Sequence, residues 1–166
     1  MSFFIYILLI MLKKKPIFWT EAKKFLKKKD KKLGKIIDNY PSDFLFSKSD
    51  PFLTLARSIV GQQISVKAAQ SVWDRLILKI GDVNPNQVYK IHSSSLKSVG
   101  LSRQKVLYLK NLSKSFINKE LKVSLWNKMT DEEIIEDLIK IKGIGRWTAE
   151  MFLIFNLCRA DVFPLD

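Results

Sequence analysis

Two glycines separated by one apolar residue constrain the fold of this chain more than any other feature. Gly143-Ile144-Gly145 separates an apolar pattern of helical spacing, Ile134 to Ile139, from a second one that runs from about Arg146 to Leu157. Glycine lacks a Cβ, so it permits a positive φ and the close approach of another backbone. The pattern predicts two helices joined by a tight hairpin, with Ile144 plugged between them. Taken alone, the two glycines also fit a plain corner between helices that needs small residues.

The same hairpin has the character of an anion site. Backbone N–H groups at a helix N-terminus attract negative charge, and this helix begins directly after the second glycine. Lys140 lies nearby and adds positive charge. We predict that a DNA phosphate binds here, through a stretch made of Lys142, Gly143, Ile144, Gly145, Arg146 and Thr148.

The rest of the chain also favours helices. It holds 6 Gly and 5 Pro in 166 residues, which argues against many hairpin turns, and its 47% hydrophobic content can supply a core. Asp50-Pro51 is typical of a helix start, and Thr130 with Glu133 forms a predicted capping box. Helices are predicted over residues 16–37 with a break, from 51, from 66, over 88–91, 94–99 and 103–118, and from 131. The sequence therefore predicts an all-α protein.

Charge and cysteine content narrow the functional classes. The net charge is +13, which favours a polyanion such as nucleic acid, although a lysine-rich composition can also reflect nucleotide bias in a genome. The single cysteine, Cys158, excludes a disulfide within the chain and a four-cysteine zinc site, and we expect it to be a small buried apolar residue. His92 is expected in a loop or at a helix start. No metal site and no cofactor are predicted.

An apolar run, Phe3–Leu12, precedes this pattern. Its ten residues are too few to span a bilayer, which takes about 20. A signal peptide carries its positive charges in front, whereas Lys13-Lys14-Lys15 follow the run. We interpret residues 1–10 as upstream of a true start at Met11, with a weak membrane anchor as the alternative.

Several motifs together resemble one known family. Lys142-Gly143-Ile144-Gly145-Arg146-Trp147-Thr148-Ala149-Glu150-Met151-Phe152, followed by Asp161-Val162-Phe163-Pro164-Leu165-Asp166, resembles the helix-hairpin-helix superfamily of base-excision DNA glycosylases. Two upstream stretches, 56–69 and 99–105, match its 3-methyladenine DNA glycosylase II branch in the same order. The resemblance covers residues 16–166 and leaves 1–15 as an N-terminal extension. It implies a two-lobed, all-α fold with the hairpin and a catalytic aspartate on one rim of a cleft and a wedge loop on the other.

The resemblance also implies which residues form the site. Asp166 matches the essential aspartate, and Asp161 is the other acid nearby; some members carry two adjacent acids, which would make Asp166 the neighbour of the catalytic one. A carboxylate suits the reaction because it stabilises positive charge on the sugar and orients water. Trp147 and Met151 match base-pocket positions, with core packing as the alternative. Bifunctional members carry a Schiff-base lysine where this chain has Trp147, which implies simple hydrolysis.

Two further expectations follow from the resemblance. Gln62-Gln63 matches the wedge that fills the duplex when a base flips out, the alternative being two exposed loop glutamines. Family members continue past the aspartate with helices that close the fold, and any iron–sulfur ligands would lie in that part. We therefore expect this chain to be incomplete at its C-terminus and inactive or very weak.

The sequence as a whole predicts a monofunctional glycosylase that removes alkylated purines of the 3-methyladenine type. Its partner would be double-stranded DNA with a damaged base, and it would act as a monomer without stable membrane association. We expect it in the cytoplasm at the nucleoid, or in the nucleus of a eukaryote. Two alternatives remain open: a helix-hairpin-helix module that binds DNA without catalysis, and a glycosylase for another lesion such as oxidised guanine. A membrane-surface protein is a third, more distant alternative.

Overall fold

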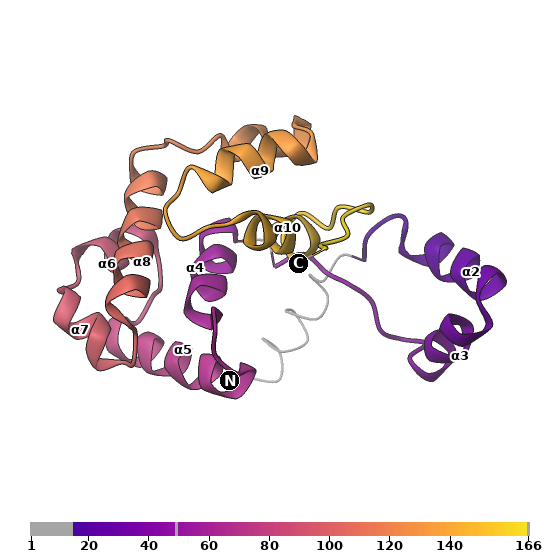
Figure 1. The fold of residues 1–166 in the computed structure, drawn as a ribbon, viewed down its shortest axis with the longest axis horizontal. Helices are drawn as coiled ribbons and strands as arrows, with labels where there is room; N and C mark the ends of the chain where they lie inside the picture. The colour runs from indigo at the N-terminus through magenta and orange to yellow at the C-terminus, as the bar shows by residue number, and fades with distance from the viewer. Residues whose placement is uncertain (1–14, 49, 166) are drawn as a thin grey trace, which may run out of the picture.

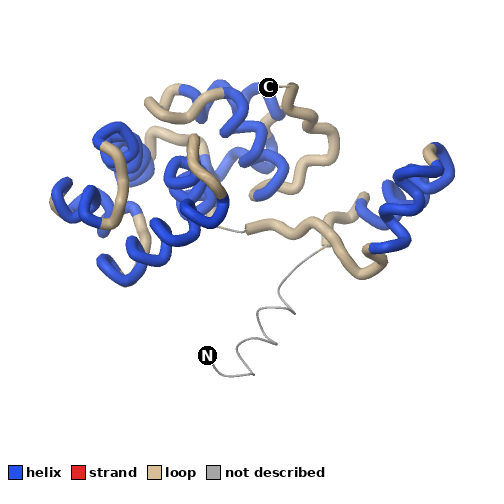
Figure 2. The backbone as a smooth tube through the Cα atoms, turned by 60° about the horizontal axis from the view of Figure 1, so that its bottom comes forward, coloured by secondary structure: helices blue, strands red, loops and turns tan. Residues whose placement is uncertain are grey.

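The computed structural model describes residues 15–48 and 50–165, and all regular elements in these two ranges are helical (Figure 2). This confirms the predicted all-α fold. In chain order the helices are α2 (Trp19–Lys29), α3 (Lys31–Asn39), α4 (Pro51–Gly61), α5 (Val66–Ile80), α6 (Pro85–Lys90), α7 (Ser93–Ser98), α8 (Arg103–Ile117), the 3-10 helix η1 (Val123–Lys128), α9 (Asp131–Ile139) and α10 (Arg146–Phe155).

Side chains fix where most of these helices begin. Asp50 accepts a hydrogen bond from the N–H of Leu53 at 2.8 Å, with Pro51 in the first turn, as predicted. The predicted capping box opens α9, and His92 caps α7. The break expected within residues 16–37 falls at Asp30, which caps α3. Local sequence chemistry therefore determines the helix boundaries.

The helices α4 to α10 pack into one body around a single core. Leu55, Ala56 and Ile59 of α4 are completely buried. This helix contacts α5, α8 and α10, while α8 packs on α6 and α7, and α9 packs on α10. The apolar spacing of α4 is therefore explained by its central position in this body.

The pair α2–α3 lies apart from that body (Figure 1). The two helices contact each other, and Gly34 is the one buried residue in the two. Residues 40–48 lead from α3 to α4. No helix in the described ranges is long and apolar enough to cross a bilayer. The apolar run at residues 3–12 lies outside the described residues.

A buried carboxylate joins η1 to α9. Asp137 is 2% exposed, and its Oδ2 accepts hydrogen bonds from the N–H of Lys122 at 2.8 Å and from Nε1 of Trp126 at 3.0 Å. Lys140 Nζ lies 3.3 Å from its other oxygen. Burial by itself raises the pKa of Asp137, but these hydrogen bonds outweigh it and lower the pKa overall.

We expect Asp137→Ala to lower the free energy of unfolding by about 2–4 kcal/mol, because the buried indole N–H of Trp126 and the partly buried N–H of Lys122 lose their acceptor. Urea denaturation at neutral pH measures this, and Asp137→Asn, which keeps one acceptor oxygen, is the milder control. Since the folded-state pKa is lowered, the wild-type contribution is present at neutral pH and is lost as the pH falls through that value. A loss equal for Ala and Asn at every pH would contradict this account.

Candidate nucleic-acid interface

The turn between α9 and α10 is the hairpin that the sequence predicts. Gly143 has a φ of +103°, and Ile144 is 4% exposed and lies in the core. A Cβ on Gly143 would lie 2.2 Å from Cγ of Tyr108, so the ring of α8 is packed against the glycine itself. Gly145 does not adopt the positive φ that glycine permits, since its φ is −92°. A Cβ there would meet nothing within 4 Å, so its outer side is open.

The N-terminus of α10 has no side-chain cap. Each α-helix from α3 to α9 begins with a capping side chain, but the residue before α10 is Gly145, which has none. The first N–H groups of a helix have no partner within it. Those of α10 are therefore left for solvent or for a ligand, and their partial positive charge suits an anion.

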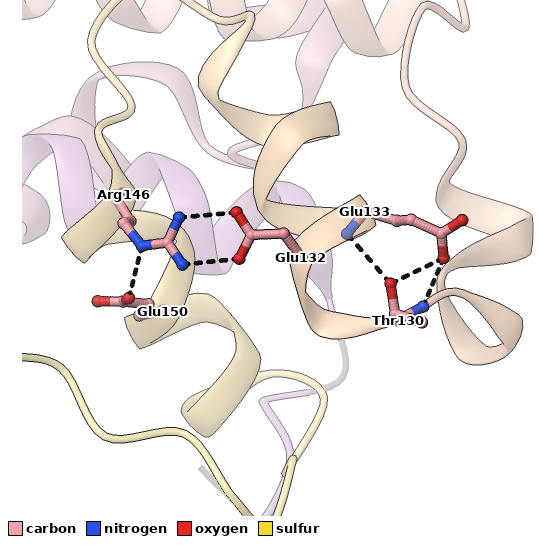
Figure 3. A network of polar contacts seen from close by, with 5 residues as sticks. All are labelled: Thr130, Glu132, Glu133, Arg146 and Glu150. Atoms are coloured by element: carbon pink, nitrogen blue, oxygen red, sulfur yellow. Dashed lines mark hydrogen bonds and ion pairs between the residues drawn. The ribbon is translucent and has the colours of Figure 1, made fainter.

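The charged side chains at the hairpin are arranged differently from the prediction. Figure 3 shows the Arg146 guanidinium between two carboxylates: it donates to both oxygens of Glu132 at 2.8 and 2.7 Å and to Glu150 at 3.2 Å. The bonds to Glu132, with a smaller effect of Glu150, raise the pKa of Arg146. The side chain of Thr148 is buried. Both residues thus offer backbone N–H groups at this surface, whereas Lys142 presents an exposed side chain.

The predicted wedge loop lies directly beside this hairpin. Gln62 ends α4, and its Nε2 donates to the carbonyl oxygen of Gly143 at 2.9 Å. Gln63 has a φ of +56° and is exposed. Lys105 Nζ donates to the carbonyl of Val60 at 2.8 Å, which supports the end of α4 from α8. The resemblance implied opposite rims for hairpin and loop, but the two are joined by a hydrogen bond.

A cleft of about 730 Å³ opens on the other side of the wedge loop. Trp147 and Met151 both line it, one turn apart on α10, together with Gln62 and Gln63. Trp147 is 47% exposed, which separates it from the core residues around it. The structure therefore brings the two predicted pocket residues and the two predicted wedge residues to one cavity.

Sequence reasoning missed two residues of this cleft. Phe155 lies one further turn along α10, so the spacing of Trp147, Met151 and Phe155 on one helix face could have identified it. Lys48 comes from the segment before α4, and its backbone N–H donates to the carbonyl of Phe155 at 3.1 Å. No sequence pattern marks Lys48, because a tertiary contact places it.

The segment that leads toward the predicted catalytic acid is anchored by Arg159. Its Nη2 donates to the carbonyl oxygens of Trp126 and Met129, both at 2.9 Å, and its Nε lies 3.3 Å from Asp131. Asp161 is exposed just beyond it. Asp166 lies outside the described residues. Cys158 is partly buried, and burial raises the pKa of its thiol.

Comparisons with known proteins agree on one family. Residues 56–152 match the HhH-GPD superfamily base excision DNA repair protein. DNA-3-methyladenine glycosylase 1 of Schizosaccharomyces pombe is 34% identical over 140 residues, which is 82% of this chain and 61% of that protein. DNA-3-methyladenine glycosylase of Saccharomyces cerevisiae is 40% identical over 126 residues, 69% of this chain and 42% of that protein. The chain thus spans less than two thirds of the length of either relative.

A solved structure gives the same result. The S. pombe 3-methyladenine DNA glycosylase in complex with abasic DNA superposes with a TM-score of 0.77 at 30% sequence identity. The match covers 88% of this chain and 74% of that one. The helix order, the hairpin and the matched residues lead to one conclusion: this chain belongs to the HhH-GPD superfamily of base excision DNA repair proteins.

Proposed function

We propose that this chain is a DNA glycosylase domain that hydrolyses the N-glycosidic bond of alkylated purines in double-stranded DNA. The observation that carries the proposal is the cleft of about 730 Å³, in which an exposed Trp147 faces the wedge loop beside an uncapped helix N-terminus. Relatives named 3-methyladenine glycosylases support the substrate class. We further propose that the protein acts as a monomer, at the nucleoid or in a nucleus.

Each part of the interface has one task in this proposal. The N–H groups at the start of α10 hold a phosphate beside Lys142. The damaged nucleotide rotates out of the duplex, and its base stacks on Trp147 next to Met151. Gln63 fills the vacated space in the duplex. Gln62, which is bonded to Gly143, keeps the wedge loop and the hairpin in register.

Asp166 supplies the chemistry. As the glycosidic bond lengthens, positive charge develops on the sugar, and a nearby carboxylate stabilises it and orients the attacking water. A purine alkylated on a ring nitrogen is a good leaving group because it departs as a neutral base. Trp147 offers no amine for a Schiff base at its position, so the proposed reaction is hydrolysis without strand cleavage.

The test is a single-turnover excision assay with enzyme in excess over duplexes that each contain one lesion. Because the relatives are longer, the chain is assayed alone and extended after residue 166 with the corresponding segment of the S. pombe relative. We expect excision of methylated purines by the extended form. Excision of oxidised guanine instead would replace the substrate class, and binding without excision of any lesion would leave a DNA-binding module.

The phosphate site makes a separate prediction. We expect Lys142→Ala to weaken binding to damaged and undamaged duplexes equally and to reduce the slope of log K against log salt by about 1. Fluorescence anisotropy over a salt series measures both. Lys79→Ala, at the opposite end of α5 from the wedge loop, removes the same charge and should leave the slope unchanged. Equal slopes for wild type and Lys142→Ala would exclude Lys142 from the phosphate site.

A further inference from the structure

Gln63 has a backbone conformation that is uncommon for a residue with a side chain. Its φ of +56° lies in the left-handed region, which glycine adopts far more readily. Such a conformation persists where the surrounding structure holds it. Gln63 is exposed between α4 and α5, and its side chain makes no hydrogen bond within the described ranges. Contacts made by its neighbours must therefore stabilise this part of the wedge loop.

One such contact reaches the end of α4 from α8. Nζ of Lys105 donates to the carbonyl oxygen of Val60 at 2.8 Å, across 45 positions of the chain. The carbonyl groups in the last turn of a helix have no partner within it and carry partial negative charge, so an ammonium group is a suitable donor. Val60 precedes Gln63 by three residues, and this bond therefore fixes the point from which the wedge loop leaves the helix.

The surroundings of Lys105 offer it no carboxylate in place of Val60. No ion pair within residues 15–48 and 50–165 includes Lys105. It lines a hollow of about 410 Å³ together with Gln62, Gln63 and Tyr108, and none of the residues that line this hollow is acidic. Burial lowers the pKa of Lys105, because its ammonium is partly removed from water. Water therefore replaces the bond to Val60 less readily than it would at an exposed site.

A second contact holds the other side of the wedge loop. Nε2 of Gln62 donates to the carbonyl oxygen of Gly143 at 2.9 Å, and the ring of Tyr108 packs against the same glycine. Tyr108 and Lys105 are three residues apart on α8, so they are neighbours on one helix face. The helix α8 therefore supports the hairpin through Tyr108 and the wedge loop through Lys105.

We propose that Lys105 is a positioning residue for base extrusion, which holds the wedge loop ready for Gln63 to enter the duplex before DNA binds. The inference rests on the proposed function, because it takes Gln63 to be the residue that fills the vacated space. A loop that is already ordered loses less conformational entropy on insertion than a flexible one, so the preformed wedge favours the extruded state. Lys105 acts through Gln63 and contacts neither the base nor the sugar.

The test measures how strongly the protein prefers a duplex with a gap to an intact one. Two duplexes of the same sequence are titrated by fluorescence anisotropy at one salt concentration, and one of them contains a tetrahydrofuran abasic-site analogue. This analogue has no base to excise, so the ratio of the two dissociation constants requires no catalytic activity of the 166-residue chain. A 2-aminopurine opposite the analogue reports, at saturating protein, whether the wedge has entered.

We expect the wild type to prefer the analogue and Lys105→Met to reduce this preference about tenfold, since a hydrogen bond from a charged donor is lost. The change in 2-aminopurine emission at saturation should shrink as well. Gln63→Ala should lose the preference by itself, and Lys105→Met should reduce it no further in that background. Lys114→Met removes the same charge from an exposed position in the last turn of α8 and should keep the wild-type ratio.

A second variant covers the case in which Lys105→Met does not fold. Lys105→Gln keeps a polar end in the hollow, but its side chain is too short to reach Val60, so we expect the same loss of preference. The absence of any further loss in the Gln63→Ala background is the result that a merely structural role of Lys105 would not produce, because a general loss of stability does not depend on the wedge side chain.

Three outcomes overturn the proposal, and they differ from one another. If Gln63→Ala loses the preference but Lys105→Met keeps it, the role of Lys105 is wrong and the wedge stands. If Lys105→Met causes the same loss with and without the Gln63 side chain, Lys105 does not act through the wedge. If the wild type binds both duplexes equally, the loop is not a wedge, and the proposed extrusion of the base falls together with this inference.

Discussion

Gly143→Ala is expected to lower the free energy of unfolding by about 2–5 kcal/mol. The backbone at this position has a φ of +103°, which an alanine adopts only with strain. The new methyl group would also lie 2.2 Å from Cγ and 2.7 Å from Cβ of Tyr108, so α8 must move away from the hairpin. Thermal and urea denaturation measure the loss.

Gly145→Ala is the matched control in the same hairpin. Its φ of −92° suits any residue, and no atom lies within 4 Å of the added Cβ. We expect its stability to stay within about 0.5 kcal/mol of wild type. Its affinity for DNA should fall, because the methyl group projects where a phosphate would approach the amides of α10. Equal stability of the two variants would contradict the packing of Tyr108 on Gly143.

Asp166→Asn is expected to reduce single-turnover excision by the extended form about 100- to 1000-fold, while its affinity for the damaged duplex stays unchanged. The amide has nearly the shape of the carboxylate but cannot offset positive charge on the sugar. The loss therefore belongs to the chemical step and not to binding.

Asp161→Asn is the control for this variant, because Asp161 is an exposed acid on the same segment. It should excise at the wild-type rate. If Asp161→Asn removed the activity and Asp166→Asn did not, the catalytic acid would be Asp161. If Asp166→Asn stayed fully active, the proposed role of this carboxylate would be wrong.

Much of the fold was predictable because local chemistry determines it. Asp50, Thr130 and Glu133 bond to backbone groups within three residues of themselves, so the sequence alone shows where α4 and α9 begin. The turn at Gly143 was predictable for the same reason, because the glycines between two helical patterns mark it locally. The backbone conformation of Gly145 was not predictable in this way. A glycine can be needed to let a ligand or another backbone approach as well as to permit a positive φ, and the sequence alone does not distinguish these two uses.

The candidate site was predictable in its residue types and not in its arrangement. Arg146 pairs with Glu132 across 14 positions, and Gln62 bonds to Gly143 across 81. Such contacts depend on how α4, α9 and α10 pack against one another, and this packing cannot be predicted from a local sequence pattern. Lys48 enters the cleft because its backbone is bonded to the end of α10, so sequence reasoning had no signal for it.

The most direct test of the account is a crystal structure of this chain bound to a duplex that contains an abasic-site analogue. We predict a phosphate within hydrogen-bonding distance of the N–H groups at the start of α10, Gln63 inside the duplex at the lesion, and the abasic sugar at the mouth of the cleft beside Trp147. A duplex held instead by the lysines of α2–α3, with that cleft facing solvent, would contradict it.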